Sequence, residues 1–144
     1  MRSLISFAIF LAFSGFVLPE RSYSSDSYSE RYSIPDSLYD QLDQIGFNEN
    51  ELEEIAVDGS VLSIKFDSEK LNTKRAYKII SVICDYTRNN PAEWQGLEFA
   101  TIEIMDFLQS NRLIFFGGIK GCLRLPAHPN DEQIKPYTEI KRGY

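Results

Sequence analysis

The residue best suited to acid–base chemistry is His128, the single histidine of the chain. Imidazole titrates near neutral pH, so a Ser-His-Asp or Cys-His catalytic site would have to use this side chain. His128 lies between Pro126 and Pro129, in a segment without a regular apolar pattern. We therefore expect a solvated side chain rather than a catalytic base. A single histidine also excludes a histidine-rich metal site.

The two cysteines, Cys84 and Cys122, are the only thiols and are 38 residues apart. Redox centres usually place two cysteines close together, as in Cys-x-x-Cys, and zinc sites need more ligands at paired spacing. A structural disulfide is the favoured interpretation, with buried free thiols or one reactive cysteine as alternatives. A bridge of this span would stabilise the fold by roughly 3–4 kcal/mol.

Paired carboxylates are the remaining route to catalysis, because glycoside hydrolysis needs only two of them across a cleft. Glu98, Glu103 and Asp106 lie along one strand-like run, where we expect them on the solvent face. The 21 acidic residues of the chain make such pairs unavoidable, so their presence carries little weight. The glycine-rich segment 117–121 lacks the spacing of a phosphate loop. The sequence predicts a protein that is not an enzyme and has no cofactor.

Binding is the other chemistry that the side chains could perform. Four glutamates, Glu49, Glu51, Glu53 and Glu54, form the densest acidic cluster. They predict either a charged strand edge that resists aggregation or a docking site for a basic protein. The lone tryptophan, Trp94, is expected to close one end of the core, with contact to a ligand or partner as the alternative. The formal net charge of −6 disfavours nucleic-acid binding.

An apolar run of about 15 residues opens the chain, against the ~20 needed to span a bilayer. Its order is that of a secretory signal peptide, assigned to residues 1–24 with cleavage after Ser24. Arg2, Arg21 and Glu20 would leave with it, which takes the net charge from −6 to −7. We expect export to the periplasm or the extracellular space. Because the cleavage site is poor, an uncleaved N-terminal anchor is the alternative.

The elements that position these residues are predicted to form one domain over 34–125. Helical spacing predicts a short helix that ends at Gly46 and a long helix that begins near Thr73. Asp58-Gly59 predicts a tight hairpin before the long helix, and a second hairpin follows it. The fold class is therefore α+β: a small, mostly antiparallel sheet in β-β-α-β-β order, stapled by the disulfide. The long helix should pack on one face, with the short helix before it. The other segments are a flexible linker (25–33), a short last strand (121–125) and an irregular C-terminal tail (126–144).

These features favour an exported, non-catalytic binding protein. Its most specific form is an inhibitor or immunity-type protein that masks a basic toxin or hydrolase. An accessory subunit of an envelope or secretion assembly is the first alternative, docking through the apolar segment Leu113–Phe116 and the tyrosine-rich linker. A small carboxylate-dependent hydrolase is the second.

Overall fold

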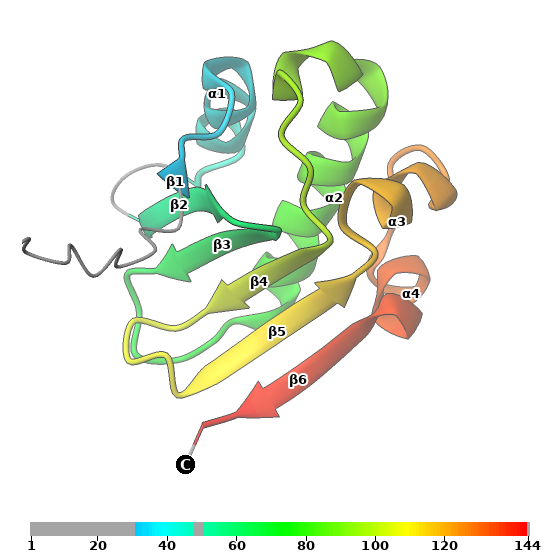
Figure 1. Ribbon diagram of the computed structural model, residues 1–144. Helices are drawn as coiled ribbons and strands as arrows, with labels where there is room; N and C mark the ends of the chain where they lie inside the picture. Colours follow the sequence, from blue (N-terminus) through cyan, green and yellow to red (C-terminus); the bar gives the residue numbers. More distant parts are fainter. Residues whose placement is uncertain (1–30, 48–50, 144) are drawn as a thin grey trace, which may run out of the picture.

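The computed structural model describes residues 31–47 and 51–143 (Figure 1). The predicted signal peptide and residues 25–30 of the predicted linker lie outside them. The strands are β1 (Arg31–Tyr32), β2 (Leu52–Asp58), β3 (Val61–Phe66), β4 (Thr101–Met105), β5 (Asn111–Phe116) and β6 (Thr138–Arg142). The α-helices are α1 (Asp36–Gln44), α2 (Thr73–Asn89), α3 (Gly118–Arg124) and α4 (Asp131–Ile134). Two 3₁₀ turns are η1 (Pro91–Trp94) and η2 (Lys135–Tyr137).

The strands lie side by side in chain order, from β1 at one edge to β6 at the other. Neighbouring strands are antiparallel except β3 and β4, which are parallel because α2 crosses over between them. This arrangement confirms the α+β class, the mostly antiparallel sheet and the β-β-α-β-β order of the central elements. It extends that order by one strand at each edge.

The core lies between the sheet and α2, which runs across one face (Figure 1). Leu62, Ile102 and Phe115 are partners across three adjacent strands and are fully buried. On α2, Ile79, Ile80, Ile83 and Cys84 form the facing apolar stripe, as their helical spacing predicted. The short helix α1 adds Leu38 and Leu42 to the same cluster.

The predicted hairpin joins β2 to β3, with Asp58 paired to Val61 across the turn. The two turn residues are therefore Gly59 and Ser60, one position later than the Asp-Gly pair that predicted them. Only Gly59 adopts a positive φ, +57°. Glycine at the first turn position supplies the backbone twist that a two-residue hairpin needs.

The predicted last strand over 121–125 is wrong, because these residues belong to helix α3 and its end. Two glycines of this helix let it approach the sheet closely. A Cβ on Gly118 would lie 2.0 Å from the Phe99 carbonyl oxygen, and one on Gly121 would lie 2.8 Å from that of Phe116. Glycine is therefore needed for close packing here, despite its low helix propensity.

The predicted irregular tail over 126–144 is also wrong for its described part, which contains α4, η2 and strand β6. Its prolines do not interrupt these elements. Pro126 and Pro129 lie in the loop before α4, and Pro136 lies in the 3₁₀ turn η2, where a fixed φ is tolerated. The proline-free residues that follow pair with β5. The domain therefore extends beyond 125 to the end of the described chain.

The predicted linker is likewise ordered at its C-terminal end, where residues 31–32 form β1 and pair with β2. Helix α1 begins after Pro35 with no side-chain cap. Nowhere in 31–47 or 51–143 is a helix both long and apolar enough to cross a membrane.

Candidate functional site

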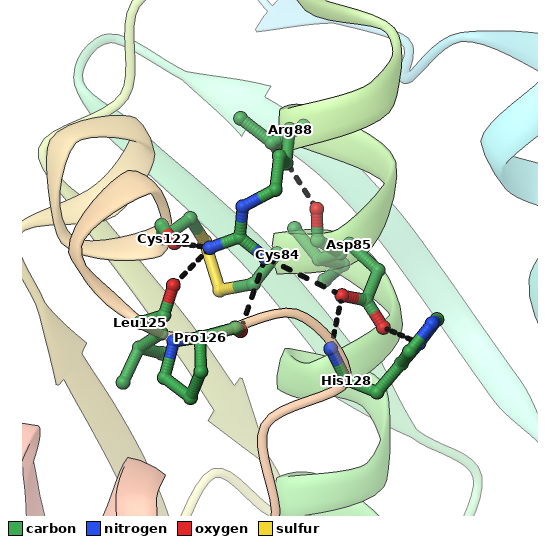
Figure 2. The surroundings of a disulfide bond; sticks show 9 residues. Cys84, Asp85, Arg88, Cys122, Leu125, Pro126 and His128 are labelled. Carbon is green, nitrogen blue, oxygen red and sulfur yellow. Dashed lines mark hydrogen bonds and ion pairs between the residues drawn. A yellow bond between two sulfur atoms is a disulfide. The ribbon is translucent and has the colours of Figure 1, made fainter.

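The predicted disulfide is present and joins Cys84 on α2 to Cys122 on α3, with the Cα atoms 4.5 Å apart (Figure 2). Arg88, one turn further along α2, reinforces this junction. Its guanidinium donates hydrogen bonds to the carbonyls of Cys122, Leu125 and Pro126. These carbonyls lie at and just beyond the C-terminus of α3, where the helix leaves carbonyl groups short of partners. The Cys122 carbonyl also accepts the Leu125 backbone N–H. The bridge and Arg88 together fix α3 and the following loop against α2.

His128 lies at the end of this loop and is held by Asp85 of α2 (Figure 2). The Asp85 carboxylate accepts a hydrogen bond from the His128 backbone N–H at 2.7 Å and contacts the ring Nδ1 at 2.7 Å. A carboxylate oxygen accepts hydrogen bonds, so Nδ1 is the donor in this contact. Arg88 lies 3.6 Å from the same carboxylate. The His128 side chain is 86% exposed, as the sequence predicted.

A cleft of about 510 Å³ lies beside this pair, between α2 and the segment after α3. Ser81 and Lys78 line it from the same helix as Asp85. A carboxylate-oriented imidazole near a serine supplies two parts of a nucleophilic triad, the base and the group that orients it. In the part of the chain that the structure describes, however, the one hydrogen bond of the His128 ring goes to Asp85 and none goes to a serine. The pair anchors the loop to α2. Sequence reasoning missed Asp85 because 43 residues separate it from His128.

Trp94 is in the core, with 2% of its surface exposed. Its indole packs edge-on against Tyr86 and Phe99, at ring-centroid distances of 5.9 and 5.0 Å. The side chain therefore closes one end of the core, as expected, and is not available as a contact for a protein partner.

The acidic cluster around the start of β2 is partly neutralised within the fold. Glu51 pairs with Arg75 of α2 at 2.7 Å, and Glu53 pairs with Lys65 of β3 at 2.7 Å. Glu54 is half-buried, and Glu49 lies outside the described residues. Of the described glutamates, Glu51 and Glu53 thus direct their charge to partners within the fold.

A different acidic surface, which sequence reasoning missed, lies on α1. Asp36, Asp40 and Asp43 follow one another at spacings of four and three, so they share one face of the helix. All three are exposed, and α1 contains no basic residue. Among the described residues none of the three forms an ion pair. We call these three residues the α1 acidic face. The signal was present in the sequence as the polar counterpart of the Leu38 and Leu42 stripe.

A polar network holds α1 in place against α2 and η1. The Ser37 hydroxyl lies 2.5 Å from the Tyr86 hydroxyl and donates a hydrogen bond to Glu93 at 2.8 Å. Tyr86 also donates to Glu93, at 3.1 Å. Burial raises the pKa of Tyr86 above its ordinary value, and Glu93 raises it further against the opposing effect of Ser37. The neutral phenol is thus favoured, and it can act as a hydrogen-bond donor in this junction.

The three carboxylates considered for hydrolysis occupy different environments. Asp106, predicted on the solvent face, is instead fully buried in the turn between β4 and β5. It accepts four hydrogen bonds, from the backbone and side chains of Ser110 and Asn111, at 2.8–3.0 Å. Burial alone raises the pKa of Asp106, but these hydrogen bonds outweigh burial and lower the pKa below its ordinary value. Glu103 pairs with Arg112, and Glu98 lines a separate cavity of about 420 Å³.

The apolar segment expected to dock in an assembly is largely internal. Strand β5 lies between β4 and β6, and Leu113, Ile114 and Phe115 are buried. Only Phe116, 44% exposed, remains on the surface. The exposed edge on this side of the sheet is β6.

Comparisons with protein families, with curated proteins and with solved structures found no match to this chain. In the described ranges, no three His, Cys, Asp or Glu side chains are grouped so that they could hold a metal ion.

Proposed function

We propose that this chain is an exported, non-catalytic binding domain that docks a basic protein partner through the α1 acidic face. The most specific form is an inhibitor or immunity-type protein that masks a basic toxin or hydrolase. The observation that carries the proposal is the exposure of Asp36, Asp40 and Asp43 without any ion-pair partner in the described chain. Their charge is thus available to another molecule, whereas that of Glu51 and Glu53 is already used in the fold.

The charge of such a surface acts mainly while the two proteins approach each other. Opposite potentials on two surfaces speed association and align the partners, and salt screens the attraction over about 8–10 Å. The net charge of −6 extends the same attraction over the whole molecule. The half-buried Tyr39 borders the α1 acidic face and adds an aromatic side chain of the kind that anchors interfaces.

Rigid placement also favours a binding role. Leu38 and Leu42 are fully buried, and Ser37 donates a hydrogen bond to Glu93 of η1. A helix held in this way presents its three carboxylates in a fixed arrangement. Less conformational entropy is then lost on binding than with a flexible acidic segment.

The disulfide supports export, because such bonds persist mainly in oxidising compartments. The test is to treat intact cells with a thiol-blocking reagent, lyse them, and label any remaining thiols before and after reduction. We expect Cys84 and Cys122 to label only after reduction. Labelling of both cysteines without reduction would contradict export.

The binding proposal is tested by capture from envelope extract at about 0.05 and 0.5 M salt, where the screening length differs several-fold. The test variant carries Asp36→Asn, Asp40→Asn and Asp43→Asn. A control variant with the same charge change carries Asp67→Asn, Glu69→Gln and Glu98→Gln, which are exposed elsewhere. We expect wild type and the control variant to retain the same partner at low salt only. Equal retention by the test variant would contradict the proposal.

A further inference from the structure

Strand β6 forms an open edge of the sheet. It pairs with β5 on one side, and no other described strand or helix lies along its outer side (Figure 1). Four of its five residues are exposed. An exposed edge presents unpaired N–H and C=O groups, which are a template for pairing with another strand.

The hydrogen bond just beyond the paired ends of β6 and β5 shows which residues of β6 direct their backbone N–H and C=O groups toward β5. The Gly143 N–H donates to the Ser110 carbonyl, and the register continues without a shift through Arg142 and Asn111. Backbone groups of alternate residues point to opposite sides of a strand. Lys141 and Glu139 therefore direct their backbone groups toward β5. Thr138, Ile140 and Arg142 direct theirs to the open side.

The side chains of this edge are complementary to themselves. If two copies of β6 run antiparallel with Ile140 opposite Ile140, Glu139 of each copy lies opposite Lys141 of the other. Neither Glu139 nor Lys141 forms an ion pair within 31–47 or 51–143. Lys141 is instead opposite Arg112 of β5, a like charge that Glu103 already engages.

The central residue fits the same arrangement. Ile140 is opposite the buried Leu113, so its side chain points to the helix-covered face of the sheet. It is 48% exposed, and pairing with its symmetry equivalent would cover part of this apolar surface. In the same register, the outward N–H and C=O groups of Ile140 form hydrogen bonds with those of Ile140 in the second copy. Those of Thr138 form hydrogen bonds with those of Arg142 in the second copy.

We propose that the chain forms a two-fold symmetric dimer by antiparallel pairing of β6 with β6 of a second copy, centred on Ile140. Helix α1 lies over the opposite end of the sheet (Figure 1). The dimer therefore leaves both α1 acidic faces open, and it does not depend on the binding function proposed above. Two such faces in one particle would bind a repeated or oligomeric partner more tightly than one.

The test measures the molar mass of the protein, purified as the cell exports it, at a series of concentrations. Light scattering and sedimentation provide the molar mass. Glu139→Lys and Lys141→Glu each place like charges opposite one another in both symmetric pairs. We expect either change to raise the dimer Kd by about tenfold or more. The double variant Glu139→Lys with Lys141→Glu restores opposite charges and should restore the wild-type Kd. Thermal melts of all three variants check that the fold is retained.

Two outcomes would overturn the proposal. One is a monomeric wild type at the highest soluble concentration, including a monomer whose β6 edge pairs with a different protein. The other is a dimer whose Kd is unchanged by both single reversals, or not restored by the double variant. The second result would assign the contact to another surface.

Discussion

The α1 acidic face and the acidic start of β2 carry the same kind of charge but differ in what that charge does. In β2 and the residue before it, Glu53 and Glu51 contact Lys65 and Arg75. On α1 the three aspartates face solvent without such contacts. The denser cluster in the sequence is thus the less available one in the fold.

The difference shows that acidic residues define a binding surface only when the fold leaves them unpaired. A strand inside a sheet places its side chains beside those of the neighbouring strands, so Glu53 meets a lysine on β3. The outer face of a helix at the end of a sheet has no such neighbours. The carboxylates of this protein therefore form a graded series, from Asp106, which the fold uses fully, to the α1 aspartates, which it does not use.

The largest effect on stability in this series is expected at Asp106. Asp106→Ala removes four hydrogen bonds and leaves buried N–H donors of Ser110 and Asn111 without an acceptor. We expect the free energy of unfolding, measured by urea denaturation, to fall by about 2–3 kcal/mol. Unchanged stability would show that this turn does not depend on the carboxylate.

The same carboxylate gives a pH signature. Its folded pKa is lowered from the ordinary value of 3.8, so its contribution is fully present above that pH. The contribution is lost as the pH falls through the folded pKa. The stability gap between wild type and Asp106→Asn should therefore be constant near neutrality and shrink on acidification. A gap that widens as the pH falls would contradict the direction of the shift.

A smaller effect is expected from the paired glutamates near β2. Glu51→Gln and Glu53→Gln each remove one partly exposed ion pair, so each should cost about 0–1 kcal/mol in the same urea measurement. Neither should reduce capture of the partner. A loss of capture with unchanged stability would move the docking surface back to the segment predicted from the sequence.

The smallest effect on stability is expected on α1. The variant Asp36→Asn, Asp40→Asn, Asp43→Asn should unfold within about 0.5 kcal/mol of wild type, because exposed side chains without partners contribute little. Circular dichroism should show unchanged helix content. A loss of more than a few kcal/mol would show that these aspartates support the fold, which would sharply weaken their assignment to binding.

Much of the fold could be predicted from periodicity and cysteine count. The apolar stripe of α2 and the alternation of β3 placed the core face correctly, since burial imposes these patterns on the sequence. The bridge between Cys84 and Cys122 followed from an even number of thiols behind a signal-like leader. Two errors fell at glycines and prolines: 121–125 was predicted as a strand, although Gly118 and Gly121 serve helix packing, and the proline-containing tail was predicted to be irregular.

The candidate site was less predictable because it depends on contacts between distant residues. Nothing near His128 in the sequence indicates that Asp85 holds it. Likewise, only the register of β2 and β3 shows that Glu53 meets Lys65. The α1 aspartates were visible as the polar side of an amphipathic helix, but their significance came from the absence of partners for them in the described fold.

The most direct test of binding through the α1 acidic face is site-specific photo-crosslinking in intact cells that produce the protein. A photoreactive residue is placed at Asp40 on the α1 acidic face and, as the matched control, at the exposed Glu69. We predict one discrete crosslinked protein of basic isoelectric point from position 40 and none from position 69. A crosslink to the same protein from position 69 but not from position 40 would contradict this prediction.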